Sequence, residues 1–90
     1  KDILYIEGLK DYLKIYLENE ARPIITLASM KSMEERLPSP RFMRVHRSYI
    51  VQTVKVKTLE RGVIVFGKTR IPVSESYKSA LMNFLNEHTV

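Results

Sequence analysis

The stretch from Arg41 to Val51, RFMRVHRSYIV, decides how this sequence is understood. It places three arginines and one histidine within seven residues, contains no acidic residue and then becomes apolar. Such a segment can be the solvated rim of an ordinary strand, a catalytic histidine site or a surface that meets an anion. The composition of the chain and the flanking segments bear on which of these three interpretations holds.

The length of 90 residues suits one small domain with a single core, so we expect residues 1–90 to form one domain. The chain contains no cysteine, which excludes disulfides and thiolate metal sites and is typical of a reducing cytoplasm. All apolar runs are too short to cross a membrane. Because the chain opens on KDILYIEG without an initiator methionine, we expect it to be part of a longer protein.

The charge of the chain is unevenly distributed. Residues 1–40 carry six Lys/Arg and seven Asp/Glu, whereas residues 41–90 carry nine Lys/Arg and three Asp/Glu. Five cations and no acid lie between Arg41 and Lys57. A one-sided basic surface attracts polyanions, first nucleic acid and second an anionic membrane. Ordinary solubility charge is the alternative.

Three short strands are expected in the first half of the chain, at residues 3–7, 12–18 and 24–27. In the second of them apolar and polar residues alternate, which is the pattern of a half-buried strand. A helix of about two turns follows, with Ser29 as its cap and with Pro38 and Pro40 as its stop. The apolar residues at helical spacing are Met30, Met33 and Leu37. This stripe favours core filling over a ligand site.

Further strands are expected in the second half, at residues 49–51, 54–60, 63–66 and 70–73. Gly62 and the segment GKT are turn signals, and Pro72 places the last strand at a sheet edge. The final segment has a helical apolar face made of Tyr77, Leu81, Phe84 and Leu85, and Ser74 or Ser76 can cap it. The expected fold is mainly β, with short antiparallel strands, one short internal helix and a C-terminal helix.

Histidine chemistry is poorly supported. His46 and His88 are the only histidines, which leaves too few ligands for a zinc site. Ser48 lies two residues after His46, so on a strand both side chains point the same way, as a nucleophile and its base would. However, no acid is near to orient His46, and no glycine-rich elbow surrounds Ser48. The sequence therefore predicts no enzyme, no metal site and no cofactor.

The basic stretch has the residue types that nucleic-acid binding uses. Lysine and arginine neutralise phosphates, and the planar fork of arginine also reads guanine edges. Hydroxyls and backbone N–H groups fix the register on phosphates. Tyr12 and Tyr16 on an outward strand face suggest RNA stacking as an alternative, but the glycine and aromatic pattern of an RRM sheet is absent. Cross-strand pairing explains these tyrosines equally well.

Four segments carry a resemblance to a known family: DILYIEGLKDYLKIYL, the short helix ending in RLP, FMRVHRSYIVQ and IPVSESYKSAL. They resemble the LytTR domain, the DNA-binding output module of many bacterial two-component response regulators. The resemblance covers nearly the whole chain. It implies a ten-stranded, mainly β fold whose loops enter successive major grooves of tandem direct repeats in duplex DNA and bend it. It also implies an N-terminal receiver domain in the full-length regulator.

By position, the resemblance assigns three loops to DNA. The first loop contributes Lys10, Asp11 and Tyr12, of which Tyr12 is taken as a base contact. In the second, Arg47 takes the base-reading position. Its neighbours Arg44, His46 and Ser48 become phosphate contacts or loop supports.

The third loop is Ser74-Glu75-Ser76, where many members of the family carry an arginine in place of Glu75. One possibility is that Glu75 accepts a hydrogen bond from a cytosine amino group while the two serines contact the DNA backbone. The other is that nearby cations take over the contact with the DNA backbone. Those cations are Lys68, Arg70 and Lys78. Gln52 stands where an asparagine is common, and we interpret this difference as one of turn geometry only.

Structural alternatives stay open for single residues and for the whole surface. Arg44 can be the outward half of an alternating strand, and Ser48 can cap a turn. The same basic surface can serve a protein-interaction or membrane-surface module. No heptads and no long exposed apolar helix indicate a dimer seam, so we expect a monomer that pairs on DNA.

Overall fold

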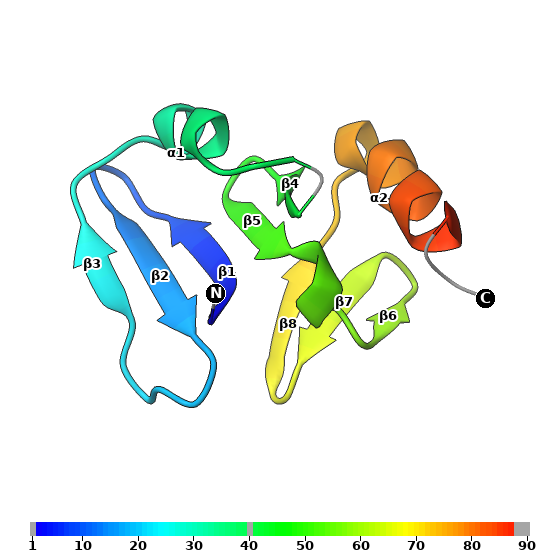
Figure 1. Ribbon diagram of the computed structural model, residues 1–90, viewed down its shortest axis with the longest axis horizontal. Coiled ribbons are helices and arrows are strands. Elements are labelled where there is room, and N and C mark those ends of the chain that lie inside the picture. The colour runs from blue at the N-terminus through cyan, green and yellow to red at the C-terminus, as the bar shows by residue number, and fades with distance from the viewer. Residues whose placement is uncertain (1, 40, 88–90) are drawn as a thin grey trace.

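The computed structural model describes residues 2–39 and 41–87, which form two antiparallel sheets and two α-helices (Figure 1). The elements in chain order are β1 (Ile3–Gly8), β2 (Leu13–Leu17), β3 (Ile24–Thr26), α1 (Met30–Arg36), β4 (Phe42–His46), β5 (Tyr49–Gln52), β6 (Leu59–Glu60), β7 (Val63–Phe66), β8 (Thr69–Pro72) and α2 (Glu75–Glu87). The expected class, mainly β with one internal and one C-terminal helix, is confirmed. The expected number of ten strands is wrong for the described residues, which form eight.

The larger sheet has the strand order β3-β2-β1-β5-β4. Its centre is buried on both faces. Tyr5 pairs with Val51 and Ile6 pairs with Ile50 across the β1–β5 ladder. Successive side chains of a strand point to opposite faces. The pair Tyr5 and Val51 therefore enters one core cluster, and the pair Ile6 and Ile50 enters the other.

Helix α1 covers the cluster that contains Ile6 and Ile50. The Ser29 hydroxyl caps it by accepting from the Ser32 N–H at 3.1 Å, as expected from the sequence. The helix ends at Arg36, two residues before Pro38, and Pro40 lies outside the described residues. The stripe of Met30, Met33 and Leu37 packs against this cluster, so the prediction that these residues fill the core is confirmed.

The second cluster joins the two sheets and α2. Its buried members are Tyr5, Val45, Val51, Ile64, Ile71 and Leu81. The smaller sheet has the order β6-β7-β8, with Gly62 and Gly67 at positive φ in its turns. Pro72 lies on the edge strand β8, as predicted. Through Leu81 this cluster holds α2 against β4.

The alternating segment at residues 54–57 does not form the strand that its pattern predicts. Thr53–Lys55 is instead a 3-10 turn, and only the last two residues of the expected strand pair, as β6. The cause lies in Thr53, whose backbone N–H and side-chain hydroxyl both donate to the Arg41 carbonyl, at 2.8 and 2.9 Å. These bonds turn the chain and leave Val54 64% exposed.

Gln52 has a larger role than the turn geometry expected from the sequence. Its side chain is fully buried. Its Nε2 donates to the Ile3 carbonyl at 2.5 Å, and its Oε1 accepts from Arg41 Nε at 2.9 Å. The amide thus ties β5 to the start of β1 and to the residue before β4, and it engages one of the cations of the basic stretch.

Tyr16 does not face outward as an RNA-stacking residue would. Its ring stacks on Tyr5 with 4.5 Å between ring centroids, and Tyr5 stacks on Phe66 at 5.5 Å. The Glu7 carboxylate accepts from the hydroxyls of Tyr16 at 3.4 Å and Tyr49 at 3.3 Å. Cross-strand pairing, the second explanation offered by the sequence, is therefore the correct one for Tyr16.

The tyrosine cluster predicts a loss of stability in alkali. Burial, followed by the neighbouring Glu7 carboxylate, raises the pKa of Tyr16 and Tyr49 above the ordinary value of 10.0. The folded state therefore holds these protons more tightly than the unfolded chain. The tighter proton binding stabilises the folded state fully below about pH 10, and this stabilisation is lost as the pH rises further. For each tyrosine, the free energy of unfolding can fall by at most about 1.4 kcal/mol per pH unit.

Urea unfolding measured between about pH 8 and pH 11 checks this expectation. The double variant Tyr16→Phe/Tyr49→Phe should show a flatter alkaline decline than the wild type. Identical declines in the two proteins would mean that other groups cause the alkaline loss.

Candidate nucleic-acid interface

The three loops expected to contact DNA lie next to one another. The Gly8 N–H donates to the Ser48 carbonyl at 2.8 Å, which ties the β1–β2 loop to the β4–β5 turn. The Ser74 N–H donates to the Val45 carbonyl at 2.9 Å, which ties the β8–α2 connection to β4, the strand that leads into this turn. Residues 9–12, 46–48 and 73–76 therefore form one border of the molecule, called here the three-loop edge, along the top of Figure 1.

The β4–β5 turn is shaped by a histidine clasp. The Ser48 N–H donates to His46 Nδ1 at 3.1 Å, so a neutral His46 ring carries its proton on Nε2. His46 also packs edge-on against Tyr49, with ring centroids 5.7 Å apart. Because His46 bonds the backbone of Ser48 and not its hydroxyl, this geometry does not form a nucleophile and base pair.

The side chain of Arg44 holds the backbone of this turn, so Arg44 is more than an outward-facing residue of an alternating strand. Its Nη2 donates to the Arg47 carbonyl at 2.6 Å, and its Nε lies 3.4 Å from the His46 carbonyl. Its Nη1 forms a salt bridge with Glu34 of α1 at 3.2 Å. The guanidinium also lies 6.0 Å from the ring centre of Tyr77 in α2. One side chain therefore contacts both helices and the turn.

Arg47 is the exposed apex of the turn. Its backbone carbonyl is held by Arg44, while its guanidinium makes no hydrogen bond or ion pair with any residue of 2–39 and 41–87. A planar fork of five donors is thus presented to solvent on an anchored backbone. This combination suits the recognition of a guanine edge or a phosphate.

The first loop presents polar side chains beside this turn. The Leu9 N–H donates to the Tyr12 carbonyl at 2.9 Å, which closes the loop. The side chains of Lys10 and Asp11 are exposed, and Tyr12 is 37% exposed. All three residues assigned to this loop therefore lie on the three-loop edge and are open to a ligand.

The third loop places Glu75 in the first turn of α2. Ser74 directly precedes the helix, as expected for a cap residue, and is half-buried, whereas Glu75 and Ser76 are exposed. An acidic residue at a helix N-terminus interacts favourably with the helix dipole. Glu75 therefore has a structural role whether or not it contacts DNA.

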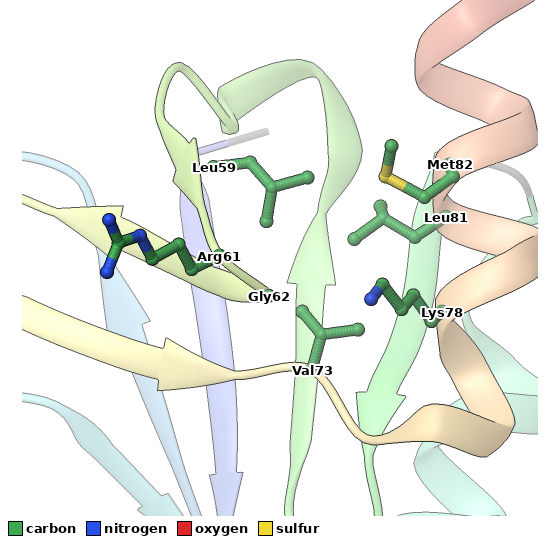
Figure 2. A pocket seen from close by; sticks show the side chains of 7 residues that line it. All are labelled: Leu59, Arg61, Gly62, Val73, Lys78, Leu81 and Met82. Carbon is green, nitrogen blue, oxygen red and sulfur yellow. The ribbon is translucent and has the colours of Figure 1, made fainter.

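The three cations suggested as replacements for the missing arginine are spread over the molecule. Lys68 lies in the β7–β8 turn, and the chain from there to Ser74 spans about 20 Å at 3.3 Å per residue. Arg70 is exposed in the middle of β8. Lys78 lies on α2 and in Figure 2 points across an apolar cleft of about 270 Å³ towards Val73. The structure thus does not bring Lys68 to the three-loop edge.

Several cations of the basic stretch have partners that lie far away in the sequence. Of its five cations, Arg41 bonds Gln52, Arg44 pairs with Glu34, and Lys55 pairs with Glu18 at 2.7 Å. The bond to Lys55 lowers the pKa of the Glu18 carboxyl. Sequence reasoning missed these partners because they lie at least ten residues away along the chain.

Other kinds of site find little support in residues 2–39 and 41–87. No group of three His, Cys, Asp or Glu side chains there is arranged to hold a metal ion, and His88 lies outside the described residues. None of the described helices has the length and apolar character needed to cross a membrane.

Comparisons with known proteins agree on one kind of domain. Residues 1–86 match the family model described as the LytTr DNA-binding domain. A sensory transduction protein LytT of Bacillus anthracis is 29% identical over 91 aligned residues, covering 94% of this chain and 36% of that protein. A protein of the same description from Enterococcus faecalis is 25% identical over 83 residues, covering 86% and 34%. The chain thus spans about a third of the length of these relatives.

A solved structure shares the fold. It is a LytTr DNA-binding domain from Bacillus cereus, described as belonging to a methyl-accepting/DNA response regulator. The two structures superpose with a TM-score of 0.78 at 26% identity, over 93% of this chain and 81% of that one.

Proposed function

Because the chain belongs to the LytTr family of DNA-binding domains, we propose that it binds duplex DNA sequence-specifically through the three-loop edge, as the output module of a transcription regulator. The observation that carries this proposal is the exposed Arg47, whose guanidinium has no partner among the described residues while its backbone is anchored. Arg47 reads a base in the major groove, and Tyr12 and Glu75 flank it as further base contacts.

Polar groups around Arg47 fix the register on the phosphate backbone. Lys10, the His46 Nε2–H and the Ser48 hydroxyl lie on the same edge as Arg47, and hydroxyl and backbone N–H groups are common phosphate donors. Asp11, Arg44, Ser74 and Ser76 support the loops or add backbone contacts. No step of this function needs a cofactor, a metal ion or catalysis.

The arrangement of the loops favours tandem direct repeats as the target. The three loops lie in a row along one border of the molecule (Figure 1). The longest dimension of the whole molecule is 37 Å, about one helical turn of B-DNA, so neighbouring copies can occupy repeats spaced by one turn. In the full-length protein we infer a cytoplasmic location and an N-terminal receiver domain. The domain is a monomer alone and pairs when neighbouring repeats are occupied.

One observation favours a second function, a protein-interaction module. The edge strand β3 and the residue after it leave Ile24 51%, Ile25 59% and Leu27 82% exposed, beside an unpaired sheet edge. This surface runs along the outer side of β3: Thr26 pairs with Leu13 beside the first loop, and Ile24 pairs with Ile15 farther along β2. The RNA-binding alternative, by contrast, loses its support because Tyr16 is packed against Tyr5.

A selection of binding sites from random duplex DNA tests the proposal. We expect enrichment of a short motif that recurs at a spacing of about one helical turn. No enriched motif, together with equal affinity for DNA and acidic liposomes, would instead favour a surface-binding module.

Lysine variants on the three-loop edge and away from it should behave differently. Lys10→Ala should weaken binding to all duplexes alike and make the log–log salt slope shallower by about 0.9, because one phosphate contact is lost. Lys68→Ala, which removes the same charge far from the three-loop edge, should leave the slope unchanged. Binding isotherms at several salt concentrations check this, and equal slope changes in the two variants would show that the loops do not define the interface.

Glu75→Arg should separate base reading from simple proximity to DNA. If Glu75 accepts from a cytosine, the variant should bind the selected site about fivefold or more weakly and a scrambled duplex more tightly. Glu75→Gln keeps an acceptor oxygen and serves as the matched control. A rise in affinity of Glu75→Arg for both duplexes would mean that Glu75 only lies near phosphate.

A further inference from the structure

Helix α1 carries a carboxylate that reaches the back of the reading turn. We propose that Glu34 is a positioning residue for sequence recognition, which acts through Arg44 to hold the backbone from which Arg47 reaches DNA. This inference rests on the proposed function, because it explains how the same surface keeps its specificity.

The connection is a chain of direct contacts. Glu34 Oε1 lies 3.2 Å from Arg44 Nη1, and Arg44 Nη2 lies 2.6 Å from the Arg47 carbonyl. The Nε of the same guanidinium faces the His46 carbonyl at 3.4 Å. The planar guanidinium of Arg44 donates to the Glu34 carboxylate on one side and to the turn on the other. The position of Glu34 therefore restricts the position of Arg47 at the apex of the turn.

The burial of Arg44 distinguishes this pair from an ordinary surface ion pair. The side chain of Arg44 is 17% exposed, and that of Glu34 is 46% exposed. The β4–β5 register also shifts between Arg44 and His46, so regular ladder bonds do not fix this part of the turn. Side-chain bonds from Arg44 supply the restraint that the strand pairing lacks there.

The expected consequence concerns specificity more than overall affinity. Bidentate reading of a base requires an oriented guanidinium, whereas attraction to phosphates tolerates a mobile one. Without Glu34, Arg44 is free to leave the Arg47 carbonyl for a DNA phosphate. The turn then keeps its positive charge, but the guanidinium of Arg47 is no longer oriented towards one base.

The charge of Glu34 itself is a confounding effect that two variants separate. Removing any acid near DNA raises the affinity for every duplex. Glu34→Gln removes the charge but keeps an oxygen that can accept from Arg44 Nη1. Glu34→Ala removes both. A pure charge effect is the same in both variants, whereas positioning is lost only in Glu34→Ala.

The test compares the affinity for the selected site with that for a scrambled duplex at one salt concentration. Glu34→Ala should lower this ratio about two- to fivefold, and Glu34→Gln should keep most of it. Glu35→Ala is the matched control, because Glu35 is an exposed acid on the same helix that makes no hydrogen bond or ion pair with any described residue. A ratio that stays constant in Glu34→Ala, or falls equally in Glu34→Gln, overturns the inference.

A measurement without DNA supports or refutes the same point. Amide relaxation of the free protein should show greater mobility at Arg47 and Ser48 in Glu34→Ala than in Glu35→Ala. Unchanged mobility in Glu34→Ala would refute the positioning role even if binding changed. Arg47→Ala, measured in parallel, distinguishes the two failures. If Arg47→Ala also leaves the ratio unchanged, the base-reading proposal itself is wrong.

Discussion

Arg47→Ala should weaken binding to the selected DNA site by about 1–3 kcal/mol, or about 5- to 150-fold, and relax the preference at one base position. The guanidinium of Arg47 is exposed on a turn whose backbone is held by Arg44 and by the His46 clasp. The variant therefore removes the fork without disturbing its support. Competition binding with a set of single-base variants of the site measures both effects.

Two controls make this result specific. Arg47→Lys keeps the charge but not the bidentate fork, so it should retain affinity for scrambled DNA and lose the base preference. Arg22→Ala removes an exposed arginine from the β2–β3 connection and should leave the base preference intact. If Arg47→Ala is folded and binds with unchanged affinity and preference, the assignment of the β4–β5 turn as the reading loop is wrong.

Ile64→Ala should lower the free energy of unfolding by about 2–5 kcal/mol. Ile64 is fully buried in the cluster that joins β1, β4, β5, the smaller sheet and α2. Truncation leaves a cavity at the junction of the two sheets, where no single element can move to fill it. For a domain of this size the melting temperature should fall by at least about 8 °C, which a thermal scan by circular dichroism measures.

The matched variants set the scale of this effect. Ile64→Val removes one methylene group and should cost about 0.5–1.5 kcal/mol. Val54→Ala truncates a side chain that is 64% exposed on the 3-10 turn and should change stability by less than about 0.5 kcal/mol. A loss in Ile64→Ala no larger than in Val54→Ala would mean that the cluster does not hold the two sheets together.

Local patterns in the sequence predicted most of the strands and both helices. The Ser29 cap, the methionine stripe and the edge position of Pro72 are set by neighbours within a few residues, and all three predictions are confirmed. The turn at Thr53 was not predictable in this way, because it depends on the distant Arg41 carbonyl. Alternation alone therefore gave a strand where tertiary bonds impose a turn.

The candidate site shows the same division between local and distant information. The resemblance indicated three loops, and the bonds from Gly8 to Ser48 and from Ser74 to Val45 bring them together. The charge run did not reveal which cations are engaged, because Glu18 and Glu34 approach from other elements. The contacts of individual residues with DNA stay predictions.

The central pairing of β1 with β5 has a consequence for how the chain folds. Tyr5 lies opposite Val51, so β1 gains its second neighbour only after more than half of these 90 residues have been made. Within this domain β1, β2, β3 and α1 leave the ribosome first, with the inner edge of β1 open. Bringing β5 to that edge closes a long loop, which places folding in the slow range of milliseconds to seconds typical of β proteins. A chain that stalls before Gln52 exposes β1 as an unpaired edge, the form in which strands recruit other copies and aggregate.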